Sequence, residues 1–298
     1  MNSPVVVWLI LSGIWGSTWL FIKLGLRDLP PISFAGIRFV IAAAVLAAIV
    51  TVRRLALPRK ARDWAFIALT GFLSFTVNYG LLFWGEQHVS SGLAAVLQAT
   101  IPLFGLVIAH FLLPAEPMRV TKTLGVLLGL AGVGVIFSND ISPETNRALA
   151  GSVAIVLGAF AVALSNVLIK SRGGQFDPPV LALGQMFFGL IPLLLIGFIK
   201  EGDPRNFHWT PLAIISLLYL AFVGSSVAFI LYYWLVRHME VTNTMLISLV
   251  TPVLAVLLGM GTIGERLSWR MGVGGGSILA GLAMIAFGGT KSKDHNRK

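Results

Sequence analysis

The chain has 298 residues, of which 56% are hydrophobic and 11% are charged, and its mean hydropathy is +0.87. Soluble domains carry roughly 25% charged residues, so this composition excludes a soluble protein and indicates a membrane protein. The net charge of +10 could suggest a nucleic-acid partner, but the basic residues lie between apolar runs, which points to membrane topology instead. The absence of cysteine excludes disulfides, thiolate metal ligands and a thiol nucleophile.

In chain order, the apolar runs predict ten membrane-spanning helices. At a rise of 1.5 Å per residue, about 18 or more apolar residues cross a hydrocarbon core of roughly 30 Å. The runs lie near residues 5–22, 31–52, 64–84, 89–113, 123–138, 148–169, 179–199, 211–236, 242–263 and 271–288. The predicted fold class is therefore an all-α integral membrane protein with ten transmembrane helices.

Charged residues are separated from these runs. All Asp and Glu residues lie between the runs, and so do all Lys and Arg residues except Arg38. When the connections are assigned to alternate sides, the side that holds both termini has twice as many Lys and Arg residues as the other. Because cytoplasmic connections are enriched in Lys and Arg, we predict that both termini are cytoplasmic and that residues 291–298 form a basic cytoplasmic tail.

The five runs of the first half recur in the second. "DLPPISFAGIRF" at 28–39 resembles "FDPPVLALGQMF" at 176–187, an offset of 148. Trp84 and Pro102 have the same separation as Trp234 and Pro252, at an offset of 150. A nearly constant offset indicates a duplication, with one five-helix repeat over 1–140 and the other over 147–290.

An odd number of spans per repeat makes the second repeat enter the membrane from the opposite side. The halves are then inverted repeats, an arrangement typical of secondary transporters that bind substrate near the midplane and alternate access. No GxxxxGK loop is present, which argues against ATP as the driving force. The predicted spans contain no Asp or Glu, which disfavours a carboxylate proton relay and favours facilitated transport.

Several short stretches resemble the drug/metabolite transporter superfamily, specifically its EamA-type ten-helix carriers. They are "WGSTWLFIK" in the first span, "AGIRF" in the second, the proline-centred fourth and ninth spans, and "GERLSWR" at 264–270. The first half departs from this pattern, because it has "PAEPMR" in place of a second "GER" motif. The resemblance covers almost the full length and implies export or exchange of small metabolites such as amino acids.

Polar and aromatic side chains within the spans are the candidates for binding a substrate. Thr244, Ser248 and Thr251 follow i, i+4, i+7 and share one helical face. The alternative role of such residues is interhelical hydrogen bonding. Few polar groups among many aromatic ones favour an apolar or aromatic solute. The predicted substrate-binding residues are Trp15, Trp19, Asn78, Tyr79, Gln98, Asn166, Phe229, Tyr233, Thr244, Ser248 and Thr251.

Arg38 is the one basic residue inside a predicted span, about seven residues from its start. Two roles compete: snorkelling or pairing with a loop carboxylate such as Glu86, and contact with a substrate carboxylate. The matching residue of the second half is Met186, so the duplication does not require a charge there. Pro102 and Pro252 stand mid-span at matching positions and predict helix bends around a cavity.

The predicted function is a secondary transporter of small metabolites, aromatic or other neutral amino acids above all, in the plasma or inner membrane. The alternatives are a broader metabolite or drug exporter and, less favoured, an intramembrane enzyme. An enzyme would need a nucleophile with a base or a metal cluster, and the spans contain one His, no Cys and no carboxylate. We therefore predict no catalytic residue, metal or cofactor, and only a small solute and lipid as partners, for a monomer or homodimer.

Overall fold

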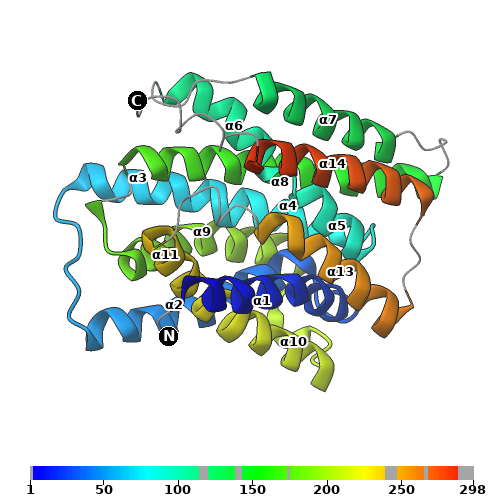
Figure 1. Cartoon of the computed structure of the whole chain (residues 1–298). Helices are drawn as coiled ribbons and strands as arrows, with labels where there is room; N and C mark the ends of the chain where they lie inside the picture. Colours follow the sequence, from blue (N-terminus) through cyan, green and yellow to red (C-terminus); the bar gives the residue numbers. More distant parts are fainter. Residues whose placement is uncertain are drawn as a thin grey trace, which may run out of the picture.

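The computed structural model describes residues 3–113, 120–137, 143–172, 175–238, 247–264 and 268–287. These residues form helices joined by turns and short loops, and the helices pack side by side as a bundle (Figure 1). Each predicted span coincides with a helix or a run of consecutive helices. Seven of the described helical stretches are long and apolar enough to cross a membrane, and two shorter apolar helices cover Val120–Gly132 and Val250–Ile263.

The helices of the first half follow the predicted order. They are α1 Pro4–Gly25, α2 Pro31–Val52, α3 Ala61–Gly71, the π-helical segment η1 Phe72–Asn78, α4 Tyr79–Glu86, α5 Ser91–Gln98, α6 Ile101–Leu112 and α7 Val120–Phe137. Proline stands in the first turn of α1, α2 and α6. This position suits proline because the first turn of a helix leaves its N–H groups unpaired anyway.

The second half repeats the order. It contains α8 Pro143–Arg172, α9 Pro178–Glu201, the 3₁₀ turn η3 Pro204–Asn206, α10 Pro211–Ala221, the π-helical segment η4 Phe222–Val227, α11 Ala228–His238, α13 Ile247–Ile263 and α14 Trp269–Phe287. In both halves a π-helical segment interrupts the third span.

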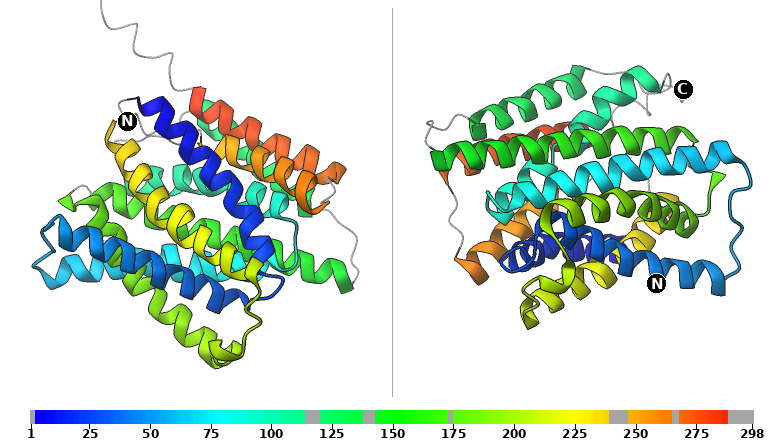
Figure 2. Two further views of the ribbon diagram at one scale, coloured as in Figure 1. Left: turned by 90° about the horizontal axis from the view of Figure 1, so that it is seen from below. Right: turned by 180° about the vertical axis from the view of Figure 1, so that it is seen from behind.

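Two helix pairs join the halves through glycine contacts. Helices α2 and α9 are antiparallel: Gly36 faces Leu194, while Gly197 faces Ser33. Helices α7 and α14 are also antiparallel, since Gly132 abuts Gly274 and Gly281 abuts Gly125, and they lie side by side in two opposite views (Figures 1 and 2). A methyl group at Gly281 would collide with the backbone oxygen of Gly125, so glycine lets the helix backbones approach closely.

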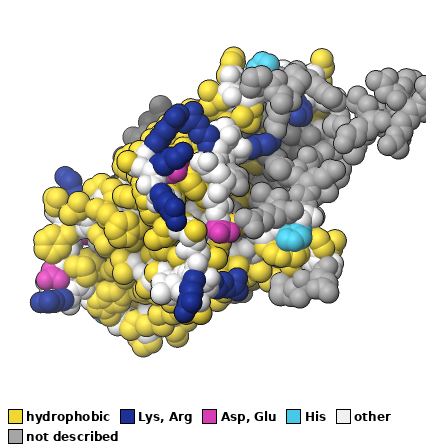
Figure 3. All heavy atoms as spheres, turned by 90° about the vertical axis from the view of Figure 1, so that its left-hand side faces the viewer, with side chains coloured by type: hydrophobic (Ala, Val, Ile, Leu, Met, Phe, Trp, Pro, Cys, Tyr) yellow, Lys and Arg dark blue, Asp and Glu magenta, His cyan; other side chains and the backbone are white. Residues whose placement is uncertain are grey.

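Basic side chains gather at the end of the bundle where α2 passes into α3 (Figure 3). This connection carries Arg53, Arg54, Arg59, Lys60 and Arg62, and α8 ends with Lys170 and Arg172. Ile169 and Phe176 pack in one apolar cluster with Trp64, which brings the end of α8 to the start of α3. We call this region the basic end. Elsewhere large apolar side chains are exposed, such as Phe198 and Ile199 on α9, which suits contact with lipid.

At the other end, α9 caps α2. Glu201 Oε1 accepts from the backbone N–H of Ile32 at 2.9 Å, and Oε2 accepts from that of Ser33 at 2.7 Å. Pro30, at the N-cap position of α2, makes no side-chain cap. The carboxylate therefore satisfies two orphan donors and complements the positive end of the helix dipole.

The loops on either side of this cap are also tied together. Thr210 Oγ1 donates to Asp28 Oδ2 at 2.5 Å, and His208 Nδ1 lies 3.4 Å from Asp28 Oδ1. The hydrogen bond from Thr210, more than the nearby His208 and Arg27, lowers the pKa of the half-buried Asp28 carboxyl below its ordinary value. Together with Glu201, Asp28 joins the α1–α2 connection to the α9–α10 connection at what we call the acidic end.

Replacing Glu201 tests the cap. We expect Glu201→Gln to lower the free energy of unfolding by about 1–2 kcal/mol, because its amide NH2 group must face a helix N–H. Thermal unfolding in detergent measures the change. Asp203→Asn is the matched control, since Asp203 accepts only from the local N–H of Arg205. Equal unfolding temperatures for the two variants would contradict the capping role.

The Asp28 contact predicts a defined pH dependence. A carboxyl whose pKa is lower in the folded protein stabilises it above the ordinary pKa, and this contribution disappears as the pH falls through the lowered value. Asp28→Asn should therefore destabilise the protein at pH 7, and the difference from wild type should shrink below about pH 4. Paired thermal unfolding curves across this range check it, and a pH-independent difference would argue against an ionic contribution.

Candidate functional site

The two π-helical segments connect the halves at equivalent places. Thr76 Oγ1 of η1 donates to the carbonyl of Gly189 on α9 at 2.7 Å. Ser226 Oγ of η4, which is 150 residues later, donates to the carbonyl of Ala42 on α2 at 3.4 Å. A π-helical turn disturbs the regular backbone ladder and is frequent at functional sites. The region between η1 and η4 is therefore the candidate functional site.

Arg38 lies on α2 beside η4 and is only 1% exposed. Its Nε donates to Ser225 Oγ at 2.8 Å, and its Nη2 donates to the carbonyl of Gly224 at 3.3 Å. The guanidinium thus stays inside the protein instead of snorkelling to an interface, which was one expected role. Glu86 acts on it electrostatically. Burying a guanidinium costs several kcal/mol, and two hydrogen bonds satisfy only part of its donors.

Aromatic rings surround this cation. The guanidinium carbon lies 5.2 Å from the ring centre of Phe39, 5.1 Å from that of Tyr79 and 5.9 Å from that of Phe83. Each such contact is worth about 0.5–1 kcal/mol, and more where water is excluded. Nη1 has no hydrogen-bond partner among the described residues. The residue is therefore a buried cation with hydrogen-bond donors to spare.

A row of aromatic rings crosses the seam between the halves. Successive ring centres lie 5.3, 6.2, 5.6, 5.9 and 6.2 Å apart along Tyr232, Trp15, Phe229, Phe75, Tyr79 and Phe83. The row passes from α11 and α1 to η1 and α4, and it ends beside Arg38. Three of the predicted binding residues, Trp15, Phe229 and Tyr79, lie in this row. Aromatic pairs at such distances stabilise each other beyond their buried area.

An amide pair lies on the same segment. Gln98 Nε2, at the end of α5, donates to Asn78 Oδ1, at the end of η1, at 2.9 Å, and both side chains are buried. Gly158 of α8 packs against Asn78 so closely that a Cβ there would lie 3.1 Å from Oδ1. The structure therefore brings these two predicted residues together. The bond between them links two helical segments, so it also fits the alternative role of these residues, which is interhelical hydrogen bonding.

The other predicted residues lie elsewhere or outside the described part. Trp19 is half-buried against the main core cluster, and Thr251 is half-buried on α13. Asn166 is exposed on α8 and so does not join the aromatic row. Thr244 falls outside the described residues, as do the side chains of Tyr233 and Ser248.

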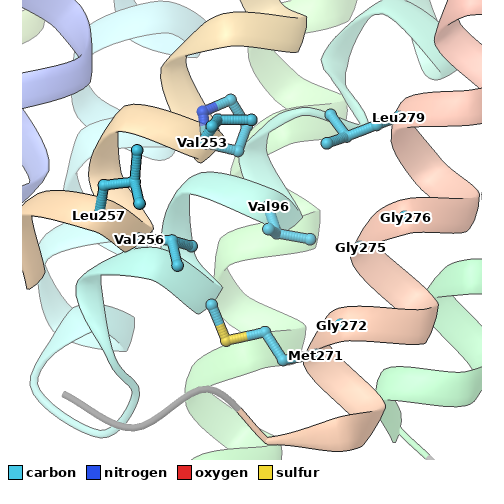
Figure 4. Close-up of a pocket in the computed structure, with 10 residues that line it drawn as sticks. Val96, Val253, Val256, Leu257, Met271, Gly272, Gly275, Gly276 and Leu279 are labelled. Atoms are coloured by element: carbon cyan, nitrogen blue, oxygen red, sulfur yellow. The ribbon is translucent and has the colours of Figure 1, made fainter. Parts of the chain in front are cut away.

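The two prolines take different positions in their helices, and Pro252 lines a groove. The fourth span breaks after Gln98, and Pro102 lies in the first turn of α6, whereas Pro252 lies within α13. Pro252 lines an apolar pocket of about 240 Å³ between α5, α13 and α14, with Val96 and Met271 opposite (Figure 4). No residue of the aromatic row lines this pocket.

Sequence reasoning missed the charges at the end of the third span. The helical stretch continues to Glu86, which is fully buried, although the apolar run ends at residue 84. Lys23 Nζ donates to the backbone carbonyls of Glu86, at 2.7 Å, and Val89, so it closes the carbonyl end of α4. The statement that the spans lack acidic residues is therefore wrong at this position, because helix and apolar run have different ends.

Ser225, Gly224 and Phe75 were also missed. In the sequence, Ser225 is one of several serines in apolar runs, and nothing local distinguishes it. The offset of 150 could have linked η4 to the segment around Tyr79, but contact with Arg38 joins residues 187 positions apart. Only packing between the halves brings them together.

Comparisons with known proteins agree with this architecture. The model of the EamA-like transporter family matches the chain twice, over residues 3–138 and 149–287. An uncharacterized transporter of Bacillus subtilis (strain 168), YoaV, is 30% identical over 92% of this chain and 93% of its own length. An uncharacterized inner membrane transporter of Escherichia coli (strain K12), YedA, is 30% identical over 92% and 88%. A solved crystal structure, 19% identical, covers 96% of each chain with a TM-score of 0.68 and shares the fold.

The chain belongs to the EamA-like transporter family of the drug/metabolite transporter superfamily. It is a multi-pass membrane protein, and a transporter role follows from the family and from the named relatives. Such a role implies a small-molecule substrate and a lipid bilayer around the protein.

A double-mutant cycle tests the amide pair. Asn78→Ala leaves the buried Gln98 amide without this acceptor, which should cost about 1–3 kcal/mol. If the bond at 2.9 Å holds the two segments together, the Asn78→Ala/Gln98→Ala double variant should cost less than the sum of the singles by about 1 kcal/mol. Unfolding in detergent measures all four proteins. Strict additivity would mean that the pair is not coupled.

Proposed function

We propose that this protein is a secondary transporter that moves small neutral or aromatic amino acids across the cell membrane by alternating access. The observation that carries the proposal is the seam between two matched halves, where an aromatic row, an amide pair and one buried cation meet. Carriers built from repeats bind their substrates at such an interface. A broader range of metabolites or drugs is the alternative within the same superfamily.

Helix directions support the inverted relation of the halves. Helix α1 ends beside the end of α4, because Lys23 donates to the carbonyls of Glu86 and Val89. Its counterpart α8 ends beside the start of α3, where Ile169 packs near Trp64. Since α3, η1 and α4 form one continuous span, α1 and α8 run in opposite directions. Opposite directions are what an inverted duplication requires.

Charge supports an orientation in the membrane. The basic end carries Arg53, Arg54, Lys60 and further Lys and Arg residues with few acids. At the opposite end, Asp28, Glu201 and Asp203 stand beside Arg27, Lys200 and Arg205, so Lys and Arg are not in excess there. By the positive-inside rule the basic end faces the cytoplasm, and both termini are then cytoplasmic.

The site chemistry supports the substrate class. The row from Trp15 to Tyr79 offers apolar ring faces and few hydrogen-bonding groups. A phosphorylated sugar would need several Lys or Arg residues, and Arg38 is the buried one here. An aromatic or neutral amino acid fits this balance better, and its gradient can drive export without a nucleotide.

Reconstituted vesicles test the transport proposal. Liposomes that contain only this protein and are loaded with unlabelled phenylalanine should accumulate labelled phenylalanine by counterflow without ATP. Competition by other amino acids, sugar phosphates and amphipathic drugs separates the amino-acid carrier from the broader exporter. Trp15→Ala should reduce uptake at least about tenfold if the ring contributes to binding, whereas the exposed Trp269→Ala should not. No counterflow with any of these solutes would reject the carrier.

A further inference from the structure

Arg38 holds more hydrogen-bonding capacity than the protein uses. A guanidinium has five N–H donors; Ser225 Oγ accepts from the one at Nε, and the Gly224 carbonyl accepts from one at Nη2. Nη1 is buried without a partner among the described residues. The rings of Phe39, Tyr79 and Phe83 attract the positive charge, and the Tyr79 side chain also acts on the guanidinium as a hydrogen-bonding group. A planar anion such as a carboxylate accepts two parallel N–H bonds from this group.

The existing partners of Arg38 belong to the opposite half. Ser225 and Gly224 lie in η4, and the bond to the Gly224 carbonyl is long, at 3.3 Å. Neutral acceptors bind a guanidinium less strongly than a carboxylate does. An anion that approached the Nη1 and Nη2 edge would therefore compete successfully with Gly224. Its arrival would loosen α2 from η4.

The equivalent contact, between α9 and η1, shows that the fold does not require a cation at this position. Met186 occupies the position that matches Arg38, and Phe75 occupies the position that matches Ser225. Both are buried in the main apolar core. The same helix pairing is thus stable with a Met and a Phe in place of an Arg and a Ser. The polar pair of Arg38 and Ser225 therefore occurs in the contact of α2 with η4 and not in the matching contact of α9 with η1. A residue that contacts a ligand would show the same asymmetry.

We propose that Arg38 binds the carboxylate of the transported solute, and that this carboxylate replaces the Gly224 carbonyl of η4 on the guanidinium. The inference rests on the carrier function proposed above. Ser225 is a positioning residue, because it holds the guanidinium through Nε and leaves Nη1 available. The solute class is a small molecule that joins a carboxylate to an apolar or aromatic group, since the rings of Tyr79 and Phe83 flank the cation. Anion binding then couples directly to the seam that must move during transport.

The wild-type protein alone gives the first test. Binding of phenylalanine and of phenylalaninamide, which has the same ring and amine but no carboxylate, is compared by calorimetry in detergent. We expect the acid to bind at least about tenfold more tightly, as a site built for a charged group rejects an analogue that lacks it. Equal affinities would overturn the anchor. Transport of both solutes would then still leave the carrier function standing.

Variants of Arg38 and η4 give the second test. Arg38→Met copies the residue of the matching position, so we expect a folded protein that binds the acid and the amide equally. Ser225→Ala removes the bond that orients the guanidinium through Nε and should weaken binding of the acid several-fold without affecting the amide. Ser226→Ala is the matched control, because its hydroxyl donates to Ala221 and Ala42 and not to Arg38. If Ser225→Ala behaves like Ser226→Ala, the positioning role of Ser225 is rejected.

A spin label tests the loosening of η4 without relying on transport. The chain has no cysteine, so a nitroxide attached at Val227→Cys, an exposed position of η4, reports on this segment alone. Adding phenylalanine should increase its mobility, and phenylalaninamide should not. A label at Leu218→Cys, exposed on α10 before η4, is the control. An unchanged spectrum at position 227 with saturating phenylalanine would contradict the release of η4.

Discussion

A hydrocarbon interior offers no hydrogen-bond partner, so every polar group of these helices must be satisfied within the protein. The side-chain bonds between the halves meet this requirement. Thr76 and Ser226 reach backbone carbonyls across the seam, and Glu201 supplies the cap that α2 lacks. Because the same bonds that satisfy these groups also join the halves, a change in their relative position must exchange hydrogen-bond partners and cannot simply break them.

This constraint gives meaning to the departures from symmetry. Antiparallel pairing of α2 with α9 and of α7 with α14 uses small residues from both halves, so the scaffold is nearly reciprocal. Arg38 and Met186 stand at matching positions but differ in charge. In a duplicated scaffold, the contact of α9 with η1 can keep its apolar packing while the matching contact of α2 with η4 acquires a ligand contact. Under the proposed role of Arg38, the energetic cost of burying it serves binding and not folding.

The two ends of the bundle are also held differently. At the acidic end, Glu201 and Asp28 tie loops of opposite halves through hydrogen bonds. At the basic end, Trp64, Ile169 and Phe176 meet in an apolar cluster. Between α2 and α3 the sequence offers Arg and Lys residues and no acid before Asp63. Protonation therefore acts on one end and leaves the apolar contacts of the other largely unaffected.

The sequence by itself determined the helices and their order, because apolar length and proline positions act locally. The offset between the two halves of the chain predicts a duplication. It also marked Arg38, Asn78, Tyr79 and Gln98, since polar groups in apolar runs are conspicuous. Only the tertiary structure decided that Arg38 turns inward to Ser225, that Asn166 faces outward, and that Glu86 is buried beyond its apolar run. These outcomes depend on which helix faces are opposed across the seam, and contacts between residues nearly 190 positions apart leave no local pattern in the sequence.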